Sequence, residues 1–196
     1  MSHGHCRPSQ VWYQAIPTHV SRAAGLETWD LHGPRCVLDA EGRVRRDGHF
    51  DDVVRTRGLD WLKAMHRPLP THIKATLEQS ALYRLLLRSH RPVDEQDAAL
   101  FAGIVGEAKQ LIESTYPQAQ FHVIFWDYDD DREVVEAVQR ELARQGVAVS
   151  AVSTILPNFP TYRARYEISP YDRHPNAMAH EMIADFVAQN LLQQIP

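Results

Sequence analysis

The sequence predicts an α/β protein of three layers, α/β/α, with helices on both faces of a short parallel sheet of about three main strands. Two observations carry this prediction. Strand, helix and strand patterns alternate from residue 121 to 153, and an apolar stretch at 11–16 supplies a further strand. Such a rhythm predicts right-handed crossovers and parallel pairing. With 196 residues the chain suits one domain, spanning 11–196 after a flexible tail at 1–10.

The first strand is predicted from the stretch VWYQAI at 11–16, which Pro17 stops. A short helical turn over 19–25 follows. Thr18 is its expected cap, and Gly25 is expected to end it.

A polar segment over 34–50 alternates in character and carries turn residues at 39–42. This pattern predicts a small hairpin formed by 36–38 and 43–45. We expect the hairpin to be an insertion outside the main sheet and near a cleft.

The middle of the chain is helical in pattern. A short helical piece is predicted over 58–65, a long amphipathic helix over 72–90 and a second helix over 94–116. Asp94 is a plausible cap for the second helix, and Pro117 lies beyond its end. Both long helices are interpreted as packing elements.

The last third is the most regular part. Apolar and β-favouring residues predict a strand at 121–127. A helix over 132–146, ended by Gly146, and a strand at 147–153 follow. The loop after that last strand is expected at the carboxyl edge of the sheet, where open α/β sheets place their sites.

The stretch 171–192 joins this polar loop to a final helix. Its expected apolar face comprises Ala177, Met178, Ile183, Phe186, Val187 and Leu191. Asp172 and His174 stand two residues apart just before the helix. A carboxylate in that place can set the tautomer of an imidazole or stabilise its charged form. The alternative interpretation is ordinary turn and capping chemistry, with Asn176 as part of it.

The string D-R-H-P-N-A-M-A-H-E-M-I-A, which begins at Asp172, resembles the last motif block of the SGNH (GDSL-type) hydrolases. The resemblance implies a flavodoxin-like sheet ordered 2-1-3-4-5 and a Ser-His-Asp triad, of which Asp172 and His174 are two members. It also implies cleavage of a small-molecule ester or an acetylated carbohydrate without a cofactor.

The chain departs from that family at the nucleophile. No Gly-Asp-Ser occurs in it, and no Gly-x-Asn-Asp follows the strand at 11–16. The match therefore runs from the family's third strand onward, as for a domain truncated at its N-terminus. The edge of strand 11–16 would then be bare, which predicts self-association or a partner.

Other residues are candidate substitutes or neighbours of the missing serine. His19, Ser21 and Asn176 are predicted to line the cleft, although Ser21 sits in a helical turn with no sharp elbow. Three further serines are expected to be ordinary hydroxyls with backbone partners, namely Ser150, Ser153 and Ser169.

Composition narrows the function classes. The formal net charge is −4, with 21 Lys and Arg against 25 Asp and Glu, so nucleic acid is not an expected partner. No run approaches the roughly 18 to 20 apolar residues that cross a bilayer. The start, MSHGHCRPSQ, lacks the apolar core of a secretory signal, so a cytoplasmic location is the default expectation unless a signal or anchor lies upstream.

No metal is expected. His3, His5 and Cys6 lie on the predicted tail and do not make a preorganised site. Exposed loop charge is the favoured interpretation of a further acidic cluster, formed by Asp47, His49, Asp51 and Asp52. His174 and His180 are six residues apart and do not share a helical face. Cys6 and Cys36 form no ligand pattern, and a disulfide between them stays open.

Two functions are compatible with the sequence. The first is an SGNH-type ester hydrolase, present as a fragment or inactive form because the serine block is missing. The second is a noncatalytic α/β module that binds a carbohydrate or a protein through an aromatic loop carrying Phe159, Tyr162, Tyr166 and Tyr171. The same four rings are also compatible with packing of the loop onto the sheet.

Overall fold

The structure, a computed structural model, describes residues 7–27, 33–50, 92–127, 132–159, 161–172 and 174–192. The chain divides into two compact units. One comprises Met1–Pro17 and Val105–Pro196, and the other comprises Thr18–Ile104. Several predictions lie outside the described residues: the tail residues His3, His5 and Cys6, the acidic Asp51 and Asp52, and the helices at 58–65 and 72–90.

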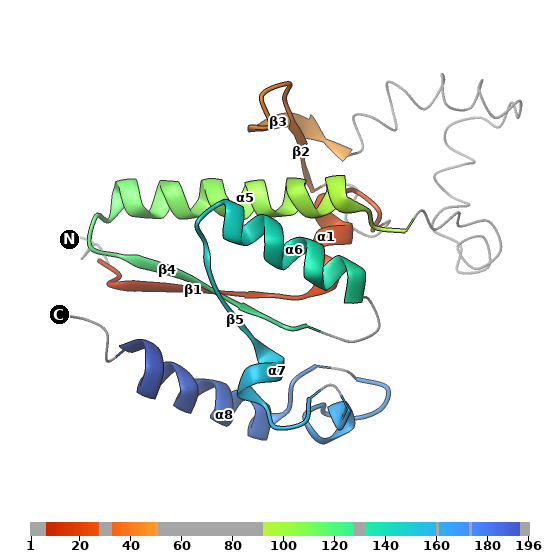
Figure 1. Cartoon of the computed structure of the whole chain (residues 1–196), viewed down its shortest axis with the longest axis vertical. Helices are drawn as coiled ribbons and strands as arrows, with labels where there is room; N and C mark the ends of the chain where they lie inside the picture. Colours follow the sequence, from red (N-terminus) through yellow and green to blue (C-terminus); the bar gives the residue numbers. More distant parts are fainter. Residues whose placement is uncertain are drawn as a thin grey trace, which may run out of the picture. The chain divides into compact units, whose positions relative to one another are not determined.

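The first unit is built on a parallel sheet of three strands, β1 (Gln10–Ala15), β4 (Gln120–Phe125) and β5 (Ala148–Ala151), in the order β1-β4-β5 (Figure 1). The α/β fold class and the parallel pairing predicted from the sequence are therefore confirmed. β1 lies at one edge of the described sheet. Association through that edge stays a prediction.

Helices cover both faces of this sheet. α6 (Arg132–Arg144) lies on one face, as does the part of α5 (Glu95–Thr115) that belongs to this unit, and α8 (Ala177–Phe186) lies on the other (Figure 1). β4 supplies apolar side chains to both layers because successive residues of a strand point to opposite faces. The result is the expected three-layer arrangement.

The layer beneath α8 holds a continuous apolar core. Its buried members are Ile124, Trp126, Val152, Leu156, Phe159, Tyr166, Ala179 and Ile183. The rings of Trp126, Phe159 and Tyr166 pack edge to face in series, with centroid separations of 5.9 and 6.2 Å. This core therefore ties the loop after β5 to both the sheet and the last helix.

The strand predicted at 147–153 runs two residues too far at its carboxyl end. β5 ends at Ala151, and Val152–Ile155 forms a helical turn, α7. The carboxylate of Asp127 explains the change, because its Oδ1 accepts the Ser153 N–H at 2.8 Å. Thr154 Oγ1 also donates to the Ala151 carbonyl at 2.6 Å. Local side-chain bonds thus replace the strand ladder.

The predicted apolar face of the last helix is wrong at its start. Ala177 and Met178 are exposed, whereas Ala179 and Ile183 are buried. The face of α8 that packs on the sheet is therefore offset by about one residue from the face that the sequence predicted. The helix continues as a π-helical turn, η4 (Val187–Leu191).

The second unit contains α1 (Pro17–Ala23), which begins at its boundary, and a separate antiparallel hairpin of β2 (Pro34–Leu38) and β3 (Val44–His49). The hairpin confirms the prediction for 34–50. The helix starts earlier than expected, since Pro17 takes the first helical position, where its fixed φ is well suited. Gly25 follows the helix with a φ of +71°.

The cap predicted for α5 is confirmed. Asp94 Oδ1 accepts the N–H groups of Gln96 and Asp97 at 2.9 and 3.0 Å, and Asp97 Oδ2 accepts the Asp94 N–H at 3.0 Å. This reciprocal arrangement is a capping box with aspartate in both places.

Among the helices that the structure describes, none is long and apolar enough to cross a membrane.

Candidate functional site

Asp172 and His174 are hydrogen-bonded to each other. His174 Nδ1 lies 2.6 Å from Asp172 Oδ1, and the same oxygen accepts the His174 backbone N–H at 3.1 Å. An ionised carboxylate only accepts hydrogen bonds, so we assign the neutral ring's proton to Nδ1. Nε2 is then the acceptor atom. The His174 side chain is 85% exposed, so this nitrogen belongs to a surface group.

The pair sits on a short hairpin-like segment, the dyad loop, formed by residues 166–172 and 174–176. Its two arms are joined where Asn176 N donates to Tyr166 O at 2.9 Å and Ile168 N donates to His174 O at 3.0 Å. An isolated bridge between Glu167 and Pro175 lies between these bonds. The backbone around His174 is therefore held by its own ladder.

The tip of the dyad loop is a four-residue turn from Ser169 to Asp172. Asp172 N donates to Ser169 O at 3.1 Å, which is the bond that closes a β-turn. Pro170 occupies the second position, where its fixed φ is favourable. Ser169 Oγ also accepts the Asp172 N–H at 3.0 Å. These bonds fix the backbone from which the carboxylate projects.

Tyr166 anchors one arm of the dyad loop in the core. Its side chain is 1% exposed, and its hydroxyl donates to the Pro157 carbonyl at 2.8 Å. An ion pair between Arg163 and Glu167 braces the same arm just after the 3₁₀ turn η3 (Arg163–Arg165). The exposed dyad therefore stands on a buried base.

Asn176 anchors the other arm. Its Oδ1 accepts the Ala179 N–H at 3.1 Å, which makes it the N-cap of α8. Its Nδ2 donates to the carbonyls of Arg165 and Glu167 at 2.8 and 3.1 Å. One side chain thus joins the helix start to both ends of a neighbouring turn. These are positioning contacts, and its predicted place in a cleft stays a prediction.

Hydrogen bonding also sets the charge of the pair. The side-chain hydrogen bond from His174, and then the backbone bond from the same residue, hold the pKa of Asp172 below its ordinary value. The carboxylate is consequently ionised at neutral pH. It faces a ring that gains a positive charge whenever Nε2 takes up a proton.

The other two predicted cleft residues lie on α1, in the second unit, whereas the dyad belongs to the first. His19 is half-buried. Its pKa is lowered mainly by burial and to a smaller extent by the charge of Arg22. Ser21 sits inside the helix, and its carbonyl accepts the Leu26 N–H at 2.8 Å. The structure brings Asp172, His174 and Asn176 together, while a place for His19 and Ser21 beside them stays a prediction.

The remaining serines are engaged elsewhere. Ser169 binds backbone N–H groups, as expected. Ser153 instead donates to the carboxylate of Asp127, and Ser150 Oγ lies 3.0 Å from Nε2 of His122. For these two serines the expected backbone partner is wrong. In the part of the chain that the structure describes, no hydroxyl is hydrogen-bonded to His174.

The pair of His122 and Ser150 is a polar contact that sequence reasoning missed. Both side chains are half-buried on adjacent strands, and the His122 ring packs 5.2 Å from that of Trp12. Burial lowers the pKa of His122, which favours the neutral ring. Period-two alternation along the predicted strands was the available signal, since it places both residues on one sheet face.

The aromatic loop divides into two pairs. Phe159 and Tyr166 are buried, as the packing interpretation requires, whereas Tyr162 is 60% exposed and Tyr171 fully exposed. Ile168 and Met178 are exposed as well. We call Tyr162, Ile168, Tyr171 and Met178 the apolar rim. Among the described residues, no three His, Cys, Asp or Glu side chains gather as a metal site would require.

Comparison with known proteins returns no match, whether against family models, curated proteins or solved structures. The resemblance of the block from Asp172 onward to SGNH hydrolases therefore stays a prediction from its sequence.

Proposed function

We propose that this chain carries the His-Asp half of an SGNH-type ester hydrolase. The observation that supports it is the 2.6 Å contact between His174 Nδ1 and Asp172 Oδ1, on a braced loop directly before the last helix. This contact leaves Nε2 as the base and places a carboxylate behind it. His174 is the proposed general base, and Asp172 orients it and stabilises its charged form.

In the proposed reaction a hydroxyl attacks the acyl carbon of an ester while its proton passes to His174 Nε2. The imidazolium, held by Asp172, then returns that proton to the leaving alkoxide, and an acyl group remains on the attacking oxygen. Water repeats the sequence with the same base and releases the acid. The hydroxyl comes from outside the described residues, on an upstream segment or a second polypeptide.

The surroundings support a small ester as substrate. Ile168 and Tyr171 flank the dyad in the dyad loop and are both exposed, so an acyl group or a sugar ring has an apolar surface to contact. The His174 ring is exposed to water, where an ion pair with Asp172 is weak. A covering surface that excludes water would strengthen this ion pair.

The test is hydrolysis of a short-chain nitrophenyl ester by this chain and by a form extended upstream to include a Gly-Asp-Ser segment. Each form is compared with His174→Ala and with the control His180→Ala, an exposed histidine six residues farther along α8. We expect the extended form to be active and His174→Ala to lower its kcat on the order of 10⁴-fold or more. His180→Ala should leave it unchanged.

Two results would overturn the assignment: an inactive extended form, or an extended form equally active without His174. Activity of the present chain alone that depends on His174 would place the hydroxyl within these 196 residues.

A second function, noncatalytic binding of a carbohydrate, is favoured by the full exposure of Tyr171 at the loop tip. Aromatic faces stack on sugar rings. Titration of the longest natural form with acetylated and plain oligosaccharides tests it, using Tyr171→Ser and the control Leu111→Ser, an exposed apolar residue on α5. Saturable binding without turnover, lost only in Tyr171→Ser, would favour this function over hydrolysis.

A further inference from the structure

A hydrogen-bonded serine and histidine lie on the parallel sheet of the first unit. Ser150 Oγ, on β5, is 3.0 Å from Nε2 of His122, on β4. His122 is the register partner of Ala148, so Ser150 is its diagonal neighbour on the same face. A hydroxyl within hydrogen-bond reach of an imidazole is the arrangement that activates a serine as a nucleophile. Nothing in the proposed hydrolase chemistry uses this pair.

The pair lies where this face of the sheet changes from covered to open. On β5 the same-face residue before the pair, Ala148, is exposed, and the one after it, Val152, is buried beneath α8. The same order is found on β4, from exposed Gln120 to buried Ile124. Solvent therefore reaches the half-buried pair from the amino ends of the strands, and a small molecule could approach there without displacing the core.

The surroundings of His122 favour its action as a base. Its ring packs 5.2 Å from that of Trp12, its register partner on β1, and Trp12 in turn packs against the core beneath α8. Burial lowers the pKa of His122, so the ring is neutral at pH 7. A neutral imidazole is the form that accepts a proton from a hydroxyl.

Ser153, three residues farther along, provides a contrast. Its hydroxyl donates to the carboxylate of Asp127, and the other oxygen of that carboxylate accepts the Ser153 N–H at 2.8 Å. This serine is thus fixed by a local turn, and its partner is a weaker base than an imidazole. Ser150 is the serine whose described hydrogen-bond partner is an imidazole nitrogen.

We propose that Ser150 is a reactive serine, with His122 as its base, that takes an acyl group from small activated esters such as aryl esters. The Ser150 oxygen attacks the acyl carbon while its proton passes to His122 Nε2, and Nδ1 carries the other ring proton. The bond from the acyl carbon to the leaving oxygen breaks, and the imidazolium returns its proton to that oxygen. An acyl-serine remains. The site shares no residue with the pair of Asp172 and His174, so its test is independent of the proposed hydrolase.

The experiment labels the full chain with an alkyl fluorophosphonate, whose phosphorus takes the serine oxygen and releases fluoride, and locates the adduct by peptide mass spectrometry. We expect the adduct on Ser150 to form on the order of 100-fold faster than on Ser114, an exposed serine of α5. His122→Gln keeps a hydrogen-bond partner for Ser150 without a base, and should slow labelling on the order of 100-fold. No adduct on Ser150, or undiminished labelling of a folded His122→Gln chain, would overturn the proposal.

Two further variants separate reactivity from structure. Ser153→Ala removes the other half-buried serine of this segment and should leave the labelling of Ser150 unchanged. Ala148→Trp places a large ring at an exposed position beside the pair, and is expected to slow the labelling while both reacting side chains remain. Undiminished labelling of a folded Ala148→Trp chain would contradict the site as described.

The acyl-transfer step is tested with 4-nitrophenyl acetate. We expect one equivalent of nitrophenol to be released and an acetyl group to appear on Ser150 in the wild-type chain, and neither in Ser150→Ala. A chain that takes the phosphonyl group on Ser150 but no acetyl group would contradict the acyl-transfer step and with it the proposal.

Discussion

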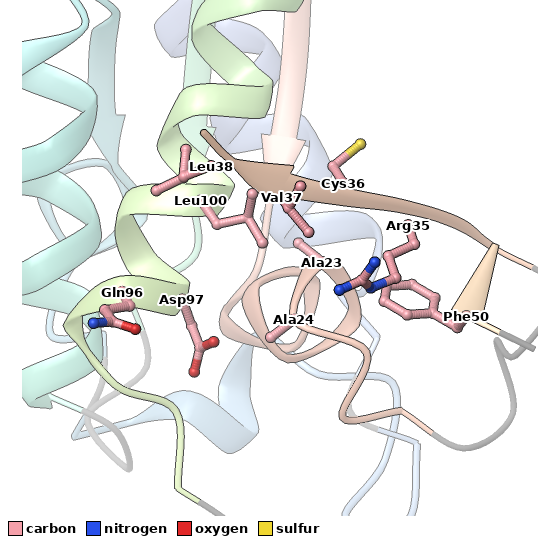
Figure 2. A pocket seen from close by; sticks show the side chains of 10 residues that line it. All are labelled: Ala23, Ala24, Arg35, Cys36, Val37, Leu38, Phe50, Gln96, Asp97 and Leu100. Carbon is pink, nitrogen blue, oxygen red and sulfur yellow. The ribbon is translucent and has the colours of Figure 1, made fainter. Parts of the chain in front are cut away.

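The dyad loop and a pocket of the second unit that is lined in part by Asp97 and Arg35 (Figure 2) both contain an aspartate and a basic side chain, yet they place the charges in opposite surroundings. Asp172 and His174 are exposed and meet at 2.6 Å, whereas Asp97 is buried and Arg35 is mostly so. In water a fixed ion pair contributes little, and away from water each charge demands a partner. The exposed pair is thus fixed in geometry but not enclosed, whereas the pocket is enclosed.

The two regions are also built differently. The dyad loop is held by its own hydrogen bonds and by two anchors, Tyr166 and Asn176, so loss of either anchor should loosen the exposed pair. The pocket depends on close approach of separate elements at Gly25 and Gly103. A single added methyl group should therefore disturb the pocket and spare the dyad.

Tyr166→Ala should have the largest effect. Removing a fully buried aromatic ring and its bond to Pro157 is expected to lower the free energy of unfolding by about 3–5 kcal/mol. Tyr166→Phe, which loses only the hydroxyl, should lose about 1 kcal/mol. Urea unfolding measures both, with exposed Tyr162→Ala as the control. A cost for Tyr166→Ala no larger than that of the control would show that the ring is not the anchor.

Asn176→Ala is expected to lower the free energy of unfolding by about 2 kcal/mol, since it removes the cap of α8 and two bonds to the preceding turn. Asn176→Asp keeps the accepting oxygen and loses the two donated bonds, so it should fall between wild type and alanine. Asn190→Ala, an exposed asparagine near the end of the same helical segment, is the control. An unaltered melting curve for Asn176→Ala would remove this residue from the support of the dyad.

Gly103→Ala and Gly106→Ala form a matched pair within α5. Alanine in a helix normally gains roughly 0.5–1 kcal/mol over glycine. At Gly103 the new methyl meets the stiff Val44 side chain at 2.7 Å, so a net loss of about 1 kcal/mol is expected. At Gly106 it meets the flexible side chain of Gln145 at 3.0 Å and beyond, so the gain should largely survive. Equal stabilities of the two variants would show that the hairpin does not pack closely on α5.

The regular part of the fold was predictable because its signals are local. Alternation and apolar content indicate β4, and the glycine and aspartate around the β2–β3 turn indicate that hairpin. The end of β5 was not predictable, because a carboxylate from the segment just after β4, that of Asp127, draws Ser153 into a helical turn. The start of the apolar face on α8 was misjudged by about one residue for a similar reason. The sheet, and not the helix pattern alone, decides which side is buried.

In the candidate site, too, contacts between residues close in sequence were predictable and contacts between distant residues were not. The nearness of Asp172 and His174 was predicted from two residues of spacing, and the structure adds the hydrogen bond between them. The pairing of Ser150 with His122 spans two strands, so no short motif shows it. The pocket around Asp97 was missed altogether, because its lining comes from three separate stretches and Asp97 reads as an ordinary helix-start residue.

The smallest expected effect is on the titration of Asp172. Hydrogen bonds from His174 lower the pKa of this carboxyl below its ordinary value of 3.8. A lowered pKa in the folded chain means that the unfolded chain takes up this proton first as the pH falls. The contribution of the pair to stability is therefore present above the ordinary pKa and is lost as the pH falls through the lowered one.

Carbon-detected NMR of the Asp172 carboxyl should show a midpoint below 3.8. His174→Ala should raise that midpoint and His180→Ala should not. A carboxyl that titrates at its ordinary pKa in wild type would mean that the two side chains are not joined in solution, and with that the geometric support for a base at Nε2 would be gone.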